Sequence, residues 1–313
     1  MKTTVITSSV NRKTKLQRLL TNLTTQTLLP DEIIIVEAGN SIWTKEDLPA
    51  ALENKITIFH APGESLSASR DRGRKAALGD VLIYLDDDVI APPTYIEHAL
   101  RHLAKHSEVM AVGGVYDDES TLTRRSWSTA IGRLLGIYGD GTKNRILSTG
   151  WADYVRGNHA DKTTDAEWLF GCNWVIRANA FEHPDVNIEV KLAAWSFLED
   201  VILGYRLTNA YGPCMRVLPE LRVIHDSSIS AGNVSTATLR MRILYRYIFW
   251  RDNLSNGNPI RTAGFWLGMF ANLLLILKQE PRYWVISEHV KTYKFNLQHR
   301  GMSLETANEY IFS

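Results

Sequence analysis

Short apolar runs alternate with helical patterns over the first 116 residues. Five runs rich in β-branched residues predict buried strands: Thr3–Ser9, Glu32–Ala38, Ile56–Ala61, Asp80–Leu85 and Val109–Tyr116. Between them, apolar side chains recur at i, i+3, i+4 and i+7, as in amphipathic helices: Leu16, Leu19, Leu20 and Leu23, then Ile96, Ala99, Leu100 and Leu103. This alternation predicts an α/β fold with a mostly parallel sheet flanked by helices, which binds ligands at the carboxyl ends of its strands.

The rest of the chain has less regular patterns. Asp117–Asp165 shows no clean period and predicts long loops, Trp168–Ala180 predicts a strand and then a helix, and Trp195–Asn209 predicts a helix. Apolar residues form one helical face within Thr238–Arg251, namely Met241, Leu244, Tyr245, Ile248 and Phe249. We therefore expect an α/β domain over 1–235, with halves of about 1–116 and 117–235, and a C-terminal helical appendage over 236–313.

The composition of the chain restricts its classes of binding partner and the cellular compartment in which it is expected. The 313 residues include 35 Lys plus Arg and 34 Asp plus Glu, so no global basic field favours nucleic acid. Cys172 and Cys214 lack the spacing of a disulfide framework or metal site, which favours a reducing compartment. The N-terminal residues lack a signal-peptide pattern, and the apolar run Ala263–Leu277 is shorter than the roughly 20 residues of a spanning helix. We expect a cytoplasmic protein.

Three adjacent carboxylates directly follow the predicted strand that ends at Leu85. In an extended chain, residues two apart point to the same side, so Asp86 and Asp88 can address one site while Asp87 turns away. A hard divalent cation, Mg²⁺ or Mn²⁺, would relieve their repulsion, and carboxylates alone do not discriminate between these ions. The alternative is that the acidic run only ends the strand or forms a turn.

A second acidic pair, Glu199-Asp200, lies between apolar and aromatic residues at the start of a predicted helix. The helix dipole favours carboxylates in the first turn of a helix. This effect alone is enough to explain an isolated acidic pair at that position. Their apolar surroundings favour the alternative that one is partly desolvated and acts as a general base toward a substrate hydroxyl.

Several motifs are missing from the sequence. No Gly-x-Gly-x-x-Gly follows the first predicted strand, and the chain has no Walker loop, Gly-x-Ser-x-Gly elbow or His-Glu-x-x-His. These absences disfavour a dinucleotide-dependent dehydrogenase, a nucleotide hydrolase, a serine hydrolase and a zinc protease.

Five segments in series resemble motifs of the family-2 glycosyltransferases, of the bacterial surface-polysaccharide type. They are Val5–Arg12 with Gln26 and Pro30–Gly39, Ser67–Gly73, Leu85–Val89, Gly171–Asn173 with Arg177, and Leu198–Asp200. They occur in the expected order over about 3–207. Glu37, Asp71 and Val10 depart from the family's usual residues, which leaves the identity of the nucleotide open.

The resemblance implies an inverting, metal-dependent transferase of the GT-A fold that uses a nucleoside-diphosphate sugar, with UDP-sugars favoured. It implies donor contacts from Ser9, Glu37, Arg70, Asp71, Asp86 and Asp87, and metal ligation by Asp86, Asp88 and His225. For His225 the alternative is a structural role. Asp200 is the implied base and Glu199 its supporting partner, although the two could exchange roles.

Acceptor specificity is expected from the irregular middle and the C-terminus. Candidate acceptor contacts are Trp151, Trp168, Gly171, Asn173 and Trp195, with core packing as the alternative for each tryptophan. The arginine-bearing amphipathic segment and Ala263–Phe270 resemble a device for binding the inner-membrane surface, which makes a lipid-linked saccharide acceptor attractive. Alternatively, these helices pack on the catalytic domain or on a second subunit of a homo-oligomer.

Two other functions remain as alternatives. A sugar-nucleotide nucleotidyltransferase also needs aspartates and metal, but it normally has a Gly-rich loop after the first strand, and Ser8–Arg12 contains no glycine. A carbohydrate-binding or scaffold protein could keep the fold without activity, and the intact Asp86, Asp88 and Asp200 argue against it.

Overall fold

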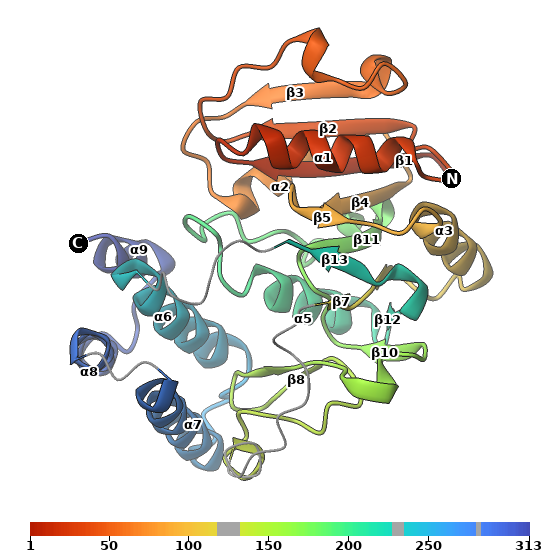
Figure 1. Cartoon of the computed structure of the whole chain (residues 1–313). Helices are drawn as coiled ribbons and strands as arrows, with labels where there is room; N and C mark the ends of the chain where they lie inside the picture. The colour runs from red at the N-terminus through yellow and green to blue at the C-terminus, as the bar shows by residue number, and fades with distance from the viewer. Residues whose placement is uncertain (118–131, 227–234, 280–282) are drawn as a thin grey trace. The chain divides into compact units, whose positions relative to one another are not determined.

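The computed structural model describes residues 1–117, 132–226, 235–279 and 283–313 (Figure 1). The chain folds into two compact units, Met1–Leu122 with Val155–Ser227, and Thr123–Tyr154 with Ser228–Ser313. The expected division at 235/236 stays a prediction of domain organisation. In the folded chain, the described stretch 132–154 belongs to the same unit as the C-terminal helices. Residues 118–131 of the expected irregular stretch lie outside the described residues.

An eight-stranded sheet forms the centre of the first unit, in the order β10-β12-β6-β11-β4-β1-β2-β3. Its strands are β1 (Thr3–Ser9), β2 (Glu32–Glu37), β3 (Ile56–His60), β4 (Val81–Leu85), β6 (Ala111–Gly113), β10 (Thr164–Ala166), β11 (Asn173–Arg177) and β12 (Met215–Val217). β11 is antiparallel to both β4 and β6, and β10 is antiparallel to β12, whereas the other strand pairs of this sheet are parallel. The predicted mixed α/β architecture with a mostly parallel sheet is confirmed.

The helices of this unit are α1 (Lys13–Thr24), α2 (Leu66–Ala76), α3 (Tyr95–Lys105) and α5 (Glu199–Tyr211). Leu16, Leu19, Leu20 and Leu23 of α1 are fully buried, so the leucine pattern identified this helix correctly. The hydropathy pattern did not predict α2, because its buried face has no aliphatic repeat and consists of Ser67, Ser69, Arg70, Asp71 and Gly73. Gly73 allows the close approach, since a Cβ there would lie 2.4 Å from Ile6 Cγ2.

Two predicted helices differ from the structure. Trp168–Ala180 contains β11 but no α-helix, because a short 3₁₀ segment, Ala178–Glu182, follows the strand. The helix expected from Trp195 begins only at Glu199, because Ala194, Ser196 and Leu198 have φ values of 49°, 54° and 70°. The left-handed region is incompatible with a right-handed helix.

A small sheet of the first unit brings a late segment back to the acidic turn. β13 (Val223–His225) lies between β5 (Val89–Ile90) and β7 (Tyr116–Asp117), with His225 opposite Val89. The Asp226 amide also donates to the Asp88 carbonyl at 3.0 Å. This pairing places His225 beside the carboxylates that follow β4.

The second unit contains a two-stranded ribbon, β8 (Arg145–Ile146) with β9 (Ala152–Asp153), followed by the C-terminal helices. The helices are α6 (Thr236–Asn253), α7 (Pro259–Gln279), α8 (Tyr283–Gln298) and α9 (Leu304–Ile311). α6 packs against α8 and α9, and the apolar face expected for α6 is buried. No helix in the described ranges is long and apolar enough to cross a membrane.

Candidate active site

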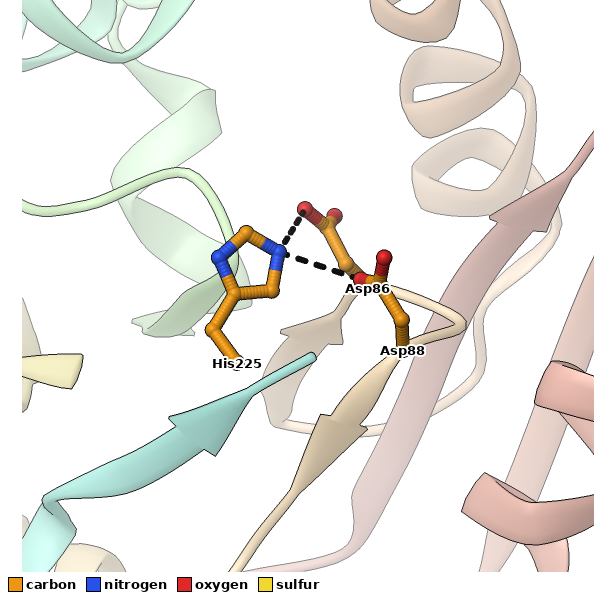
Figure 2. A group of neighbouring side chains, drawn as sticks. All are labelled: Asp86, Asp88 and His225. Carbon is orange, nitrogen blue, oxygen red and sulfur yellow. Dashed lines mark ion pairs between the residues drawn. The ribbon is translucent and has the colours of Figure 1, made fainter. Parts of the chain in front are cut away.

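The acidic turn after β4 is the centre of the site. Asp86, Asp88 and His225 each offer one ligand atom, and these atoms lie within 4.8 Å of one another (Figure 2). His225 Nε2 is 3.0 Å from Asp88 Oδ1 and 4.0 Å from Asp86 Oδ2. Asp86 and Asp88 thus offer atoms to one place, and metal ligation by Asp86, Asp88 and His225 stays a prediction.

Asp87 is buried and bonded to other protein groups, and it is not one of these three candidate ligands. Its side chain is 3% exposed, accepts a hydrogen bond from Ser9 Oγ at 2.8 Å and pairs with Arg12 Nη1 at 2.8 Å. Burial raises the pKa of Asp87 to about 6, against the effects of Arg12 and Ser9. Asp87 thus ties the end of β1 to the acidic turn, and the predicted donor contact of Asp87 remains a prediction.

Cationic groups surround Asp88. Arg12 Nη2 forms an ion pair with Asp88 Oδ2, and Lys15 Nζ lies 3.4 Å from the same oxygen. Burial alone would raise the pKa of Asp88, yet the hydrogen bonds and charges of His225 and Arg12 hold it well below its usual range. Asp88 in turn raises the pKa of His225 despite the opposing effect of burial. Sequence reasoning did not identify Arg12 and Lys15, because no local pattern connects them with residue 88.

Arg70 connects the acidic turn with the second acidic pair. Its side chain is 4% exposed, and it binds Glu199 Oε1 through Nη1 and Asp86 Oδ1 through Nη2, the latter at 2.5 Å. Nη2 also donates to the Gly171 carbonyl at 2.7 Å, and the guanidinium lies over the Trp174 ring. Arg70, expected as a donor contact, therefore holds the two acidic motifs in one arrangement.

Asp200 lies in the first turn of α5 and is bound by two backbone amides, and its role as a base stays a prediction. Its Oδ1 accepts a hydrogen bond from the Val201 amide at 2.9 Å, and Oδ2 accepts one from the Gly171 amide at 3.4 Å. Burial raises the pKa of Asp200, and these amides and Arg70 only partly oppose the effect. The neighbouring Glu199 is 5% exposed and already paired with Arg70, which distinguishes the two carboxylates.

The segment before this pair is conformationally strained. Ala194, Ser196 and Leu198 are non-glycine residues with positive φ, a conformation that costs about 1–3 kcal/mol each and is concentrated at functional sites. The segment is fastened to the start of α2, where the Leu66 amide donates to the Ala194 carbonyl at 2.8 Å and the Ser67 amide to Ser196 Oγ at 3.0 Å. The hydropathy pattern of the sequence did not predict these positive φ values.

A cavity of about 440 Å³ opens beside the acidic turn. Its walls include residues from the ends of β1 and β2, the start of α2 and the strained segment: Ser8, Ser9, Val10, Arg12, Ala38, Gly63, Glu64, Leu66, Asp86, Asp87, Ala194 and Trp195. Trp195, expected on the acceptor side, is 40% exposed and shares this wall with the expected donor residue Ser9.

The other expected donor contacts have protein partners. Glu37 is fully buried, and its Oε1 accepts hydrogen bonds from the amides of Gly39 at 2.8 Å and Asn11 at 3.1 Å. Asp71 pairs with Arg74 and Lys75 on its own helix. Contacts of Glu37 and Asp71 with a nucleotide stay predictions.

The expected acceptor residues are mostly buried. Trp168 is 5% exposed, and Asn173 is fully buried with its Oδ1 accepting a hydrogen bond from the Gly114 amide. Trp151 belongs to the second unit, where it is 7% exposed and lies under the Arg246 guanidinium. Gly171 contributes its amide and carbonyl to Asp200 and Arg70. Acceptor contacts of these residues stay predictions.

The sheet and the acidic turn define a GT-A fold, the nucleotide-sugar transferase architecture of the structural neighbours. The chain belongs to glycosyl transferase family 2, since the model of that family matches residues 4–183. It is 26% identical over 149 residues to the putative glycosyltransferase EpsH of Bacillus subtilis, covering 47% of this chain and 42% of that protein. It is 28% identical over 112 residues to a glucosyl-dolichyl phosphate glucuronosyltransferase of Haloferax volcanii, covering 35% of this chain and 36% of that protein. The chain thus matches less than half the length of these relatives.

Solved structures share the fold at low sequence identity. GalNAc-T7, crystallised with UDP, GalNAc and Mn²⁺, has a TM-score of 0.58 at 17% identity, covering 84% of this chain and 51% of that chain. Residues 1–349 of TarS from S. aureus have a TM-score of 0.58 at 11% identity, covering 93% of this chain and 79% of that chain. The mannosyltransferase PcManGT of Pyrobaculum calidifontis, in complex with GDP-Man and Mn²⁺, has a TM-score of 0.55 at 14% identity, covering 99% of this chain and 78% of that chain.

Proposed function

We propose that the protein is an inverting, metal-dependent glycosyltransferase that moves a sugar from a nucleoside-diphosphate sugar to a hydroxyl group of a saccharide. One observation carries the proposal: Arg70 joins the acidic turn to the Glu199-Asp200 pair beside a cavity, in a member of glycosyl transferase family 2. The cavity is lined in part by Asp86 and Asp87 of the acidic turn, and Arg70 links that turn to Glu199, which supports a donor site next to the proposed cation site and base.

The cavity is the proposed donor site. Its volume of about 440 Å³ lies within the range of small-molecule sites, and Trp195 offers an apolar ring face while Ser8 and Ser9 offer polar groups. Solved neighbours contain UDP, UDP-GlcNAc or GDP-Man, which supports a nucleoside-diphosphate sugar as ligand. We favour a UDP-sugar.

The residues of the acidic turn fit a divalent cation. Two carboxylates and an imidazole offer ligand atoms within 4.8 Å of one another, and oxygen and imidazole nitrogen are ligand types that Mn²⁺ accepts. A bound Mn²⁺ or Mg²⁺ would supply positive charge that stabilises a diphosphate leaving group. Asp86, Asp88 and His225 would hold the ion, and Arg70 fixes Asp86 from the protein side.

Asp200 is the proposed base. The acceptor oxygen forms a bond to the anomeric carbon as the bond from that carbon to the diphosphate oxygen breaks, and the hydroxyl proton passes to Asp200. A carboxylate with a raised pKa is a stronger base than an exposed aspartate, provided that it is ionised. Glu199, paired with Arg70, supports this arrangement.

The proposed acceptor is a saccharide, free or lipid-linked, within polysaccharide synthesis at the cytoplasmic side of a membrane. The relative from Haloferax volcanii is named for transfer to a dolichyl phosphate-linked sugar, which supports the lipid-linked form. A homo-oligomer stays a prediction.

Donor binding can be tested by thermal shift with UDP, GDP, dTDP and CMP, each with and without Mn²⁺, since a ligand of the folded state raises its apparent stability. We expect one nucleoside diphosphate to raise the melting temperature only with Mn²⁺, and Asp88→Asn to remove that dependence. Asp161→Asn, at an exposed ion pair with Arg222, is the matched control and should behave like the parent. A folded protein that responds to none of these ligands would contradict the proposed function.

A further inference from the structure

Helix α8 has the reverse of the usual polarity for a surface helix in water. It buries four polar residues, Glu288, His289, Thr292 and Asn296, together with Val285. The buried Glu288 accepts a hydrogen bond from Arg240 Nε of α6 at 2.6 Å. On the outside, Tyr283, Trp284, Val290 and Leu297 are 83%, 37%, 54% and 46% exposed. A helix that packs its polar face inward leaves an apolar face for another medium.

Helix α7 presents a continuous apolar stripe. Ile260, Ala263, Leu267, Phe270 and Leu274 are all exposed and alternate in steps of three and four, which places them on one helical face. Phe265 and Met269, by contrast, are 0% and 1% exposed. The two helices are neighbours, because the Tyr293 hydroxyl donates to the Met269 carbonyl at 2.8 Å.

The charged residues of α7 and α8 indicate what these exposed apolar faces contact. Helix α7 contains no acidic residue, and the one acidic residue of α8, Glu288, is buried. The exposed charges of these helices include Arg261, Lys291 and Lys294. The exposed surface of these helices thus combines aromatic and aliphatic side chains with more basic than acidic residues. This composition is typical of helices that lie in the interface of an anionic lipid bilayer.

We propose that the outward faces of α7 and α8 bind the surface of an anionic lipid bilayer. The apolar side chains at 260, 267, 270 and 274 enter the boundary between headgroups and acyl chains, and Lys291 and Lys294 attract anionic headgroups. An interface with a second copy of the chain is the competing explanation, but it does not require that the exposed charges described on α7 and α8 be basic. The inference does not depend on the transferase activity.

Vesicle flotation tests the proposal with the full chain. Vesicles of phosphatidylcholine with phosphatidylglycerol should bind the protein, and vesicles of phosphatidylcholine alone should bind it far less. Each basic residue near an anionic surface strengthens binding about fivefold, so Lys291→Gln with Lys294→Gln should weaken binding about 25-fold. Leu267→Ser and Phe270→Ser should each weaken it about tenfold or more through loss of inserted apolar area.

Leu78→Ser is the matched control, because Leu78 is 82% exposed and lies in the first unit. It should bind vesicles like the parent, and circular dichroism should show all variants to be folded. Absence of binding to anionic vesicles, or binding that the α7 and α8 substitutions leave unchanged, would overturn the proposal. Sedimentation equilibrium measures the oligomeric state of the same variants. If the parent is a dimer and Leu267→Ser or Phe270→Ser makes it a monomer, this face binds a second copy of the chain instead of a membrane.

Discussion

The ion pair between Arg70 and Glu199 should contribute strongly to the stability of the folded chain. Both side chains are almost completely buried, 4% and 6% exposed, so removal of one partner leaves an uncompensated charge in the protein interior. Such a change costs about 3–5 kcal/mol. We therefore expect Arg70→Met to lower the free energy of unfolding by about this amount.

A double-mutant cycle separates this pairing from general packing effects. Glu199→Gln alone should also destabilise the protein, but the double variant should be more stable than the sum of the single effects by about 1–3 kcal/mol, because neither charge of the pair remains. Asp86 can tolerate the loss of Arg70 better than Glu199, since its side chain is 27% exposed to water.

Urea unfolding followed by circular dichroism measures each free energy. The control is Arg72→Met on the same helix, because Arg72 pairs with Glu64 at the surface with 45% of its side chain exposed. Surface pairs contribute about 0–1 kcal/mol, so this variant should remain close to the parent. If the effects of Arg70→Met and Glu199→Gln add within about 0.3 kcal/mol, Arg70 does not hold the second acidic pair as described.

Two further substitutions test the close packing under the site and the wall of the cavity. Gly73→Ala should lower the free energy of unfolding by about 1–3 kcal/mol, because the new Cβ would lie 2.4 Å from Ile6 Cγ2; Gly301→Ala, where the Cβ meets no atom within 4 Å, is the control in the same urea titration. Trp195→Ala should weaken donor binding about 2- to 12-fold in a calorimetric titration, since a stacked ring contributes about 0.5–1.5 kcal/mol. Trp284→Ala, at a similarly exposed tryptophan in the other unit, should leave donor affinity unchanged.

The elements that the sequence revealed are those that bury aliphatic side chains at a regular spacing. The leucines of α1 recur at helical spacing and β4 is a continuous apolar run, and the acidic residues that follow β4 marked the candidate site. α2 buries serines, an arginine and a glycine, so hydropathy did not predict its place in the core. The start of α5 was missed because the positive φ values of the preceding segment have no signature in residues other than glycine.

The site itself depends on contacts between distant parts of the chain. His225 reaches Asp88 through the pairing of β13 with β5, and Arg12 reaches it from the loop after β1. Residue spacing indicated neither contact, and only the resemblance to a family suggested His225. Asp87 and Glu37 could be recognised as polar residues at strand ends, but their use of internal partners follows from burial that only the folded chain shows.

Asp200 provides the most direct test of the proposed mechanism, through turnover measured separately from donor binding. With the donor identified by thermal shift, transfer to an added saccharide is measured across pH, alongside donor affinity by calorimetry. Asp200 must be ionised to accept the proton, and burial raises its pKa, so turnover should rise with pH and reach its plateau above the range of an exposed aspartate, whose pKa is about 3.9.

Asp200→Asn should lower turnover by about 100-fold or more while donor affinity and stability stay close to the parent. Asp165→Asn, on an exposed strand residue of the same unit, should retain full turnover. A parent-like rate in Asp200→Asn with donor bound would contradict the assignment of Asp200 as the base.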